Sequence, residues 1–291
     1  MNLLAFLAGP LQFELTQRAF VEASLVSIAC GVLGVFVVLR GLAFVGDALS
    51  HCVVPGVVVA VLTQASRELW GGAAAMLSAW AIAVLTRRRV LASDPAIAVV
   101  FTGTFALGLA LISGTRSYLN DLTEILFGAI LAVSPTDLVI SSVVAIVVLG
   151  AIVVLYWPLV LVSFDSVAAR AQGLPVERLD IAFYGLLALA IVSGLIAVGT
   201  TLVTGLLIVP AATARLLVRR VAMQMVLSAA VGCLASWAGL YASYYLQIGA
   251  GGAIILAAAL LFVMALLAAP ARRAAVQWLS RPAVGAAAIR P

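Results

Sequence analysis

Charged residues are scarce in this chain. They make up 9% of its 291 residues, while hydrophobic residues make up 65% and the mean hydropathy is +1.26. Soluble domains carry roughly 25% charged residues, so a soluble protein is excluded. Lysine is missing altogether, and all 16 basic residues are arginines. These arginines are scattered between apolar runs, which excludes the basic patch of a nucleic-acid-binding protein. The scarcity of charge predicts a polytopic membrane protein.

Cysteine-based sites and the common catalytic motifs are also lacking. The three cysteines, Cys30, Cys52 and Cys233, lie in apolar runs without CxxC spacing. This spacing argues against a disulfide framework or a zinc cluster. The chain contains no Walker A, HExxH or GxSxG string, which are the signatures of nucleotide binding, zinc proteolysis and serine hydrolysis. It therefore has no recognisable nucleotide site of its own and is predicted not to be an enzyme.

Long apolar runs are abundant. A helix that crosses a bilayer needs about 20 apolar residues. Gly199-Thr200-Thr201 alone separates two of the runs, so an all-α fold with eight or nine transmembrane helices is expected. The shorter stretch 124–134 is expected to be re-entrant or interfacial. The nine runs are residues 19–39, 42–63, 69–86, 95–113, 136–157, 181–199, 201–218, 224–246 and 252–269.

The arginines predict the orientation in the membrane. If the loops that follow the first, third, fifth, seventh and ninth runs are cytoplasmic, 13 arginines lie inside and three lie outside. The positive-inside rule favours this arrangement. With nine spans the N-terminus is then outside and the C-terminus inside. Residues 1–291 are expected to form one transmembrane domain with a polar C-terminal tail at 271–291.

Two ionisable residues, Asp47 and His51, stand inside the second run, and His51 is the only histidine. At positions i and i+4 of a helix their side chains share one face. An acid within a span is a functional candidate by default, and a carboxylate beside an imidazole suits a divalent metal ion. Pro55 is expected to kink the helix and expose the carbonyl oxygen of His51. Asp47 is expected to be the deepest acid, with Glu22 about one turn from the outer end of its run.

The pair also has other interpretations. An Asp–His hydrogen bond can staple two helices together, and the same two groups can relay protons or ions in an ion-coupled secondary transporter. An intramembrane metal-dependent hydrolase is disfavoured, because nothing like HExxH supplies its general base. A metal ion needs about four ligands, so the others must come from distant spans, from water or from a second copy of the chain. Asp and His suit Mn²⁺, Fe²⁺ and Zn²⁺ alike.

The cytoplasmic segment 163–175 is expected to contain a short helix. Ser163 or Asp165 can cap its start, and Gly173 followed by Pro175 ends it. The segment has few large apolar residues with which to rest on a membrane surface. We therefore expect it to dock into a groove on another protein.

A second proline, Pro210, lies within the run 201–218 and is expected to break that span, freeing the carbonyl of Leu206. Small residues follow at 211–214, and small residues let helices approach closely. Two interpretations are open: close packing, or a gate or hinge on a pathway. Pro55 and Pro210 are thus the candidate helix breaks.

Several strings taken together resemble one protein family. They read GVFVVLR at 34–40, GDALSH at 46–51, LFG at 126–128, FD at 164–165 with GLP at 173–175, and PAATA at 210–214. In their order and spacing they resemble the permeases of manganese, zinc and iron ABC transporters. The resemblance covers about residues 18–268. Cys52 departs from the family, which usually has a small apolar residue there.

The resemblance implies an importer subunit in the bacterial cytoplasmic (inner) membrane, surrounded by membrane lipid. A homodimer of permeases, two cytoplasmic ATPase subunits and an extracytoplasmic metal-binding protein are implied, with a heterodimer of permeases as an alternative. The metal ion is the transported substrate, and no permanently bound cofactor is implied. Asp47 and His51 are implied to handle metal in the membrane. Segment 163–175 is implied to be the coupling helix that docks into the ATPase, with coupling residues Ser163, Phe164, Asp165, Ala168, Arg170, Gly173 and Pro175.

Overall fold

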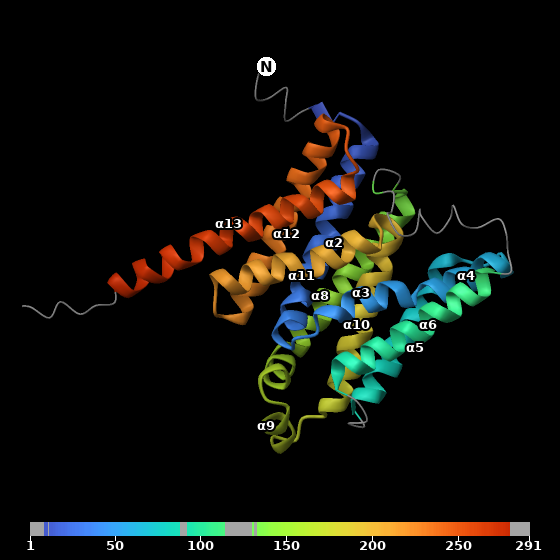
Figure 1. The fold of residues 1–291 in the computed structure, drawn as a ribbon, viewed down its shortest axis with the longest axis horizontal. Coiled ribbons are helices and arrows are strands. Elements are labelled where there is room, and N and C mark those ends of the chain that lie inside the picture. Colours follow the sequence, from blue (N-terminus) through green and yellow to red (C-terminus); the bar gives the residue numbers. More distant parts are fainter. Residues whose placement is uncertain (1–8, 11, 88–91, 114–129, 131–132, 280–291) are drawn as a thin grey trace, which may run out of the picture.

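The described chain is built of helices joined by short links (Figure 1). The computed structural model describes residues 9–279 except 11, 88–91, 114–129 and 131–132, and these residues contain no strand. Nine of the helical segments among them are long and apolar enough to cross a membrane, which confirms the all-α polytopic fold. In chain order the helices are α2 (Glu14–Leu39), α3 (Ala43–Cys52), α4 (Val54–Thr63), α5 (Arg67–Arg87), α6 (Ser93–Ser113), α8 (Pro135–Phe164), α9 (Ser166–Ala171), α10 (Val176–Val198), α11 (Thr200–Leu217), α12 (Val221–Leu246) and α13 (Ala250–Leu279).

The boundary between α10 and α11 decides between eight and nine spans. Gly199 separates the two helices and has φ +89°, a backbone conformation that a residue with a Cβ rarely adopts. The chain therefore turns here, and α10 and α11 are separate spans.

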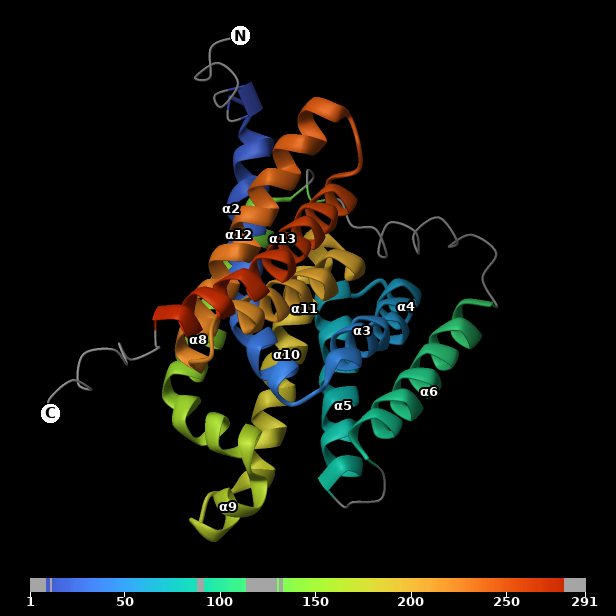
Figure 2. The same ribbon diagram turned by 60° about the vertical axis from the view of Figure 1, so that its left-hand side comes forward.

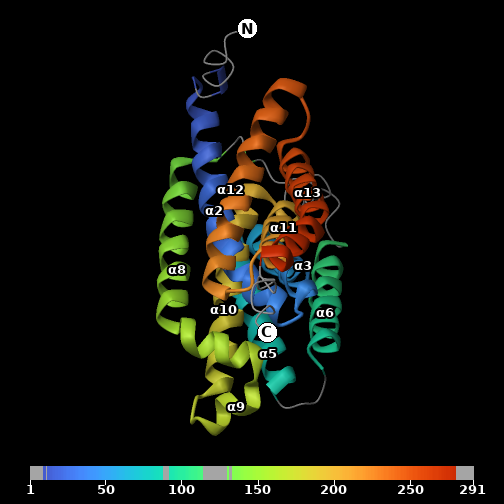
Figure 3. The ribbon, with the colours of Figure 1, turned by 90° about the vertical axis from the view of Figure 1, so that its left-hand side faces the viewer.

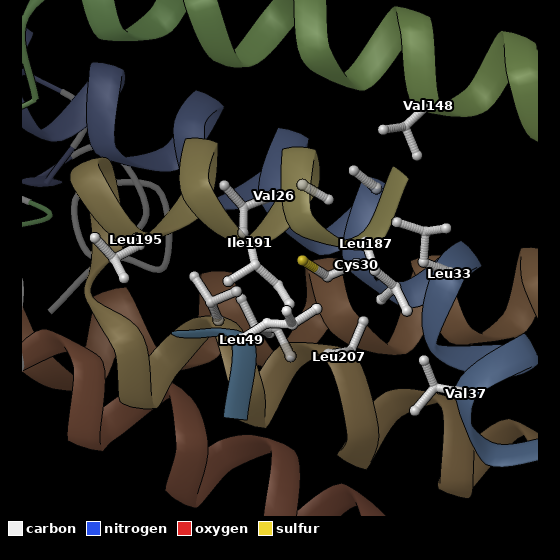
Figure 4. Packing of buried hydrophobic residues seen from close by; sticks show 14 of the residues in the cluster. Val26, Cys30, Leu33, Val37, Leu49, Val148, Leu187, Ile191, Leu195 and Leu207 are labelled. Carbon is white, nitrogen blue, oxygen red and sulfur yellow. The ribbon is translucent and has the colours of Figure 1, made fainter. Parts of the chain in front are cut away.

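Helix α2 lies at the centre of the bundle and packs against α8, α11 and α12. Gly34 makes the contact with α11 possible, because a Cβ at this position would overlap the carbonyl oxygen of Leu207. Figure 4 shows the core around this contact, with Leu49 of α3 beside Ile191 of α10 and Leu207 of α11. Leu49 is fully buried. Helix α3 is therefore anchored in the main core through the face that bears Leu49.

Helix α9 lies at one end of the molecule, next to the ends of α8 and α10 and opposite the start of α2 (Figures 2 and 3). It packs against α8 and α10. Four buried residues there, Val162, Ala169, Val176 and Leu179, form a small hydrophobic cluster that is separate from the main core. The end of the molecule that carries α9 thus has its own packing.

One expectation about the remaining segments changes, and another stays a prediction. Helix α13 continues to Leu279, so the first part of the expected polar tail 271–291 is helical, and residues 280–291 lie outside the described part. Most of the stretch 124–134 also lies outside the described residues, so its expected re-entrant form stays a prediction.

Candidate functional site

Asp47 and His51 lie on one face of α3, as their spacing predicts. His51 Nε2 is 3.7 Å from Asp47 Oδ1, and the side chains are 23% and 56% exposed for His51 and Asp47. Two donor atoms that each lie about 2.1 Å from one metal ion are at most about 4.2 Å apart, so this separation admits a shared ion. Because both residues belong to α3, the pair does not staple two helices. The pair lies on the surface of the single chain, accessible to an ion.

The imidazole of His51 is held by two aromatic rings of α6. Its ring centroid is 5.7 Å from that of Phe101 and 5.6 Å from that of Phe105, and the two phenyl rings stack on each other. Nδ1 of His51 is buried without a hydrogen-bond partner, whereas a metal-binding histidine usually donates that N–H to an oxygen. Aromatic packing therefore orients the ring and leaves Nε2 toward Asp47. No local sequence signal connects α6 with His51, so the sequence did not identify these residues.

The ligand set of this pair is incomplete. Within the described part of the chain, no group of three or more His, Cys, Asp and Glu residues could hold a metal ion. Cys52, the neighbour of His51, is buried and its Sγ lies 3.0 Å from Thr104 Oγ1. It is therefore engaged with α6 and stays a packing residue.

The helix break expected near Pro55 lies at Val53, where α3 ends and α4 begins. The carbonyl oxygen of His51 does not stay free there, because the N–H of Val53 donates to it. The expected break at Pro210 is wrong. Helix α11 runs through Pro210, which is buried. The small residues that follow it lie in a helix that packs against α2, α12 and α13, and a role of Pro210 in a gate stays a prediction.

The segment 163–175 contains a helix, although a shorter one than expected. Asp165 caps it, and its Oδ1 accepts hydrogen bonds of 2.9 Å from the N–H groups of Val167 and Ala168. Gly173, with φ +79°, ends it. Ser163 is not the cap, because it belongs to α8, where its Oγ donates to the carbonyl oxygen of Leu159.

The exposed side of this segment carries large apolar side chains. Phe164 and Val167 are each 67% exposed, while Ala169 faces the bundle and is buried. Arg170 is exposed and Ala168 half-buried, and Pro175 stands directly before α10. Val167 was not among the predicted coupling residues, because its exposure depends on which face of the short helix packs on α8. The segment thus presents two apolar side chains away from the bundle.

Glu22 lies deeper in the bundle than expected. Because α2 begins at Glu14, two turns precede Glu22, and the residue is completely buried. Its Oε1 accepts a 2.5 Å hydrogen bond from Ser141 of α8, and Ser141 contacts Ser193 of α10 at 3.2 Å between hydroxyl oxygens. Asp47 is therefore not the most enclosed acid of the chain.

Comparisons with known proteins agree over nearly the whole chain. Residues 12–269 match the profile of the ABC 3 transport family. The manganese transport system membrane protein MntC of Halalkalibacterium halodurans is 40% identical over 269 residues, 92% of each chain. The manganese import system permease protein ScaB of Streptococcus parasanguinis is 37% identical over 268 residues, 92% of this chain and 95% of that protein. The solved structure of PsaBC from Streptococcus pneumoniae in complex with Fab has a TM-score of 0.81 and 35% identity, covering 94% of this chain and 98% of the matched chain.

Proposed function

The chain belongs to the ABC 3 transport family and is a multi-pass permease of a bacterial cell membrane, and from this premise we propose that it carries a divalent transition-metal ion inward, driven by ATP hydrolysis on partner subunits. The observation that carries the proposal is the Asp47–His51 pair on one exposed face of α3. An acid and the chain's single histidine are costly in a membrane helix and suit a metal ion.

A second copy of the permease completes the site in this proposal. Asp47 and His51 supply two donor atoms where a metal ion needs about four, and the exposed carboxylate of Asp47 is open to a facing chain. A homodimer brings two such pairs together around one pathway. The site binds weakly, because an ion must leave it as readily as it enters.

Manganese is the ion we favour. Two of the relatives are named as manganese transport or import proteins, and a carboxylate with an imidazole suits Mn²⁺. An extracytoplasmic metal-binding protein delivers the ion to the permease. No cofactor is needed by the chain itself, since the metal is the substrate.

The test is reconstitution. Liposomes that contain the chain with its ATPase subunits are expected to accumulate radiolabelled manganese only when ATP and the metal-binding protein are present. Liposomes that contain the chain alone are exposed to a proton gradient in parallel. Accumulation by the chain alone would overturn the ATP-driven proposal and support the ion-coupled secondary transporter.

The exposed apolar side chains of segment 163–175, Phe164 at the end of α8 and Val167 in α9, are proposed to contact the ATPase. Replacing Phe164 and Val167 together by alanine is expected to weaken ATPase binding at least about tenfold, because burying each large side chain contributes roughly 1.5–3 kcal/mol. Affinity is measured by titrating ATPase onto the permease in nanodiscs. The control replaces Val139 and Ile146 of α8, which are equally exposed at 63% and 71% but lie away from α9. Equal affinities of the two double variants would place the docking surface elsewhere.

A further inference from the structure

Arg40 joins three helices at the end of the molecule that carries α9. It directly follows α2, and its side chain is only 9% exposed. Nη1 donates a 2.8 Å hydrogen bond to Asp180 Oδ1 of α10, and Nε donates a 3.0 Å hydrogen bond to Ser163 Oγ of α8. The guanidinium carbon lies 4.3 Å from the ring centroid of Phe183. The planar guanidinium group of arginine can donate several hydrogen bonds and stack on an aromatic ring at the same time.

Two of these contacts reach the part of the chain that carries α9. We call residues 161–180 the coupling unit: the end of α8, α9 and the start of α10. Its hydrophobic cluster is separate from the main core. A polar cavity of about 250 Å³, lined among others by Arg40, Thr86 and Asp180, lies between the unit and the ends of α2 and α5. The Arg40 contacts thus join the end of α2 to two helices of the unit beside this cavity.

Arg40 is also tied to the helix that carries the metal pair. Gly41 follows it with φ +71°, and the N–H of Leu42 donates a 2.9 Å hydrogen bond to the carbonyl oxygen of Val37. This tight turn leads directly into α3, which begins at Ala43 and bears Asp47. A displacement of Arg40 therefore acts on the N-terminal end of α3 with only a short, hydrogen-bonded turn between them.

We propose that Arg40 is the positioning residue that transmits movement of the coupling unit to α3 and so to the Asp47–His51 pair. The proposal rests on the proposed function, in which the ATPase moves α9. When the coupling unit moves, Ser163 and Asp180 move with it and displace the hydrogen-bonded guanidinium of Arg40. The turn at Gly41 then displaces the N-terminal end of α3. Packed elements with two discrete arrangements are the means by which such coupling travels.

The first test measures metal ions transported per ATP hydrolysed in the complete reconstituted complex. Arg40→Gln is expected to lower this ratio at least about tenfold while ATP hydrolysis stays within about twofold of the parent. Arg40→Lys, which keeps the charge but not the two-pronged contact, is expected to fall between. The double variant Arg40→Gln with Asp180→Asn is expected to have the same ratio as Arg40→Gln alone. Two residues that act through one shared contact have non-additive effects.

The control is Arg220→Gln. Arg220 is an exposed arginine directly before α12, so this substitution also removes one positive charge, but away from the Arg40 contacts. It is expected to keep the parental ratio. A parental ratio in Arg40→Gln would overturn the proposal. So would a parallel fall in transport, hydrolysis and melting temperature, because that pattern indicates a merely structural role.

The second test follows the helices directly and needs no metal transport. Spin labels are placed at Phe44 at the start of α3, at Gln172 after α9, and at Met223 of α12, all exposed, in a chain whose three cysteines are replaced by alanine. Upon nucleotide binding to the ATPase-bound complex, the 44–223 distance is expected to change in the parent and to stay constant in Arg40→Gln, although the 172–223 distance changes in both. An identical 44–223 response in both chains would overturn the proposal. If the parent complex responds in this way but carries no metal, the proposed function fails and the role of Arg40 stands.

Discussion

Alanine at Asp47 or at His51 is expected to lower manganese uptake at least about 100-fold while the complex with the ATPase still assembles. Each substitution removes one of the two side chains that the proposed function assigns to the metal ion, and the described part of the chain has no group of three or more His, Cys, Asp and Glu residues that could hold the ion in their place. Loss of groups that merely orient metal ligands typically costs 10–100-fold, and loss of a ligand itself is expected to cost more. Uptake of radiolabelled manganese by the reconstituted complex measures the effect, and size-exclusion chromatography confirms assembly.

The matched control for this prediction is Cys52→Ala. Cys52 is adjacent to His51 but is buried and faces Thr104, so its loss is expected to leave uptake within about twofold of the parent. Uptake at the parental rate in both the Asp47 and the His51 variant would remove the metal role of the pair. Equal loss in all three variants would point to general damage of α3 instead of loss of ligands.

Alanine at Gly34 is expected to prevent normal packing of α2 against α11. A Cβ there would overlap the carbonyl oxygen of Leu207 and would also press on Ala211. The obstacle is mainly backbone, which no rotamer change can clear, so the two central helices must move apart. Overpacking a well-packed core costs about 1–3 kcal/mol and sometimes more. We expect the melting temperature of the purified protein to fall by about 2–12 °C.

Gly103→Ala and Gly150→Ala are the controls for the Gly34 substitution. Both glycines lie within helices, in α6 and α8, and a Cβ at either position meets nothing within 4 Å. Alanine favours an exposed helix interior by about 1 kcal/mol relative to glycine, so neither control is expected to lower the melting temperature. A Gly34→Ala protein that melts with the controls would show that α2 and α11 can separate at little cost.

The helical spans could be predicted from the sequence because each depends on a local property. A run of about 20 apolar residues satisfies its backbone hydrogen bonds only as a helix when it lies in a membrane. Gly199 marks the α10–α11 boundary in the same local way, through its backbone freedom. Pro210 shows the limit of such reasoning. Proline disfavours a helix interior, yet α11 continues through it because the packing of the neighbouring helices holds the span together.

Part of the candidate site was also accessible from local spacing. The separation of four residues places Asp47 and His51 on one face of a helix. The sequence offers Ser163 and Asp165 as alternative caps of the short helix, and the structure selects Asp165. Helix α9 is shorter than expected because α8 extends to Phe164. Where a long helix ends is decided by its packing, and sequence patterns locate such ends poorly.

The sequence by itself determined the class of the protein and the helix face that carries the Asp47–His51 pair, and it limited the number of spans to eight or nine. Composition and helical periodicity depend only on residues near one another in the sequence, so they can be determined without knowing how the helices pack. Only the tertiary structure decided that Phe101 and Phe105 hold the His51 ring, and that Arg40 reaches Ser163, 123 residues away, and Asp180, 140 residues away. Contacts at such separations follow from how helices pack against one another, and no local pattern encodes which side chains then meet.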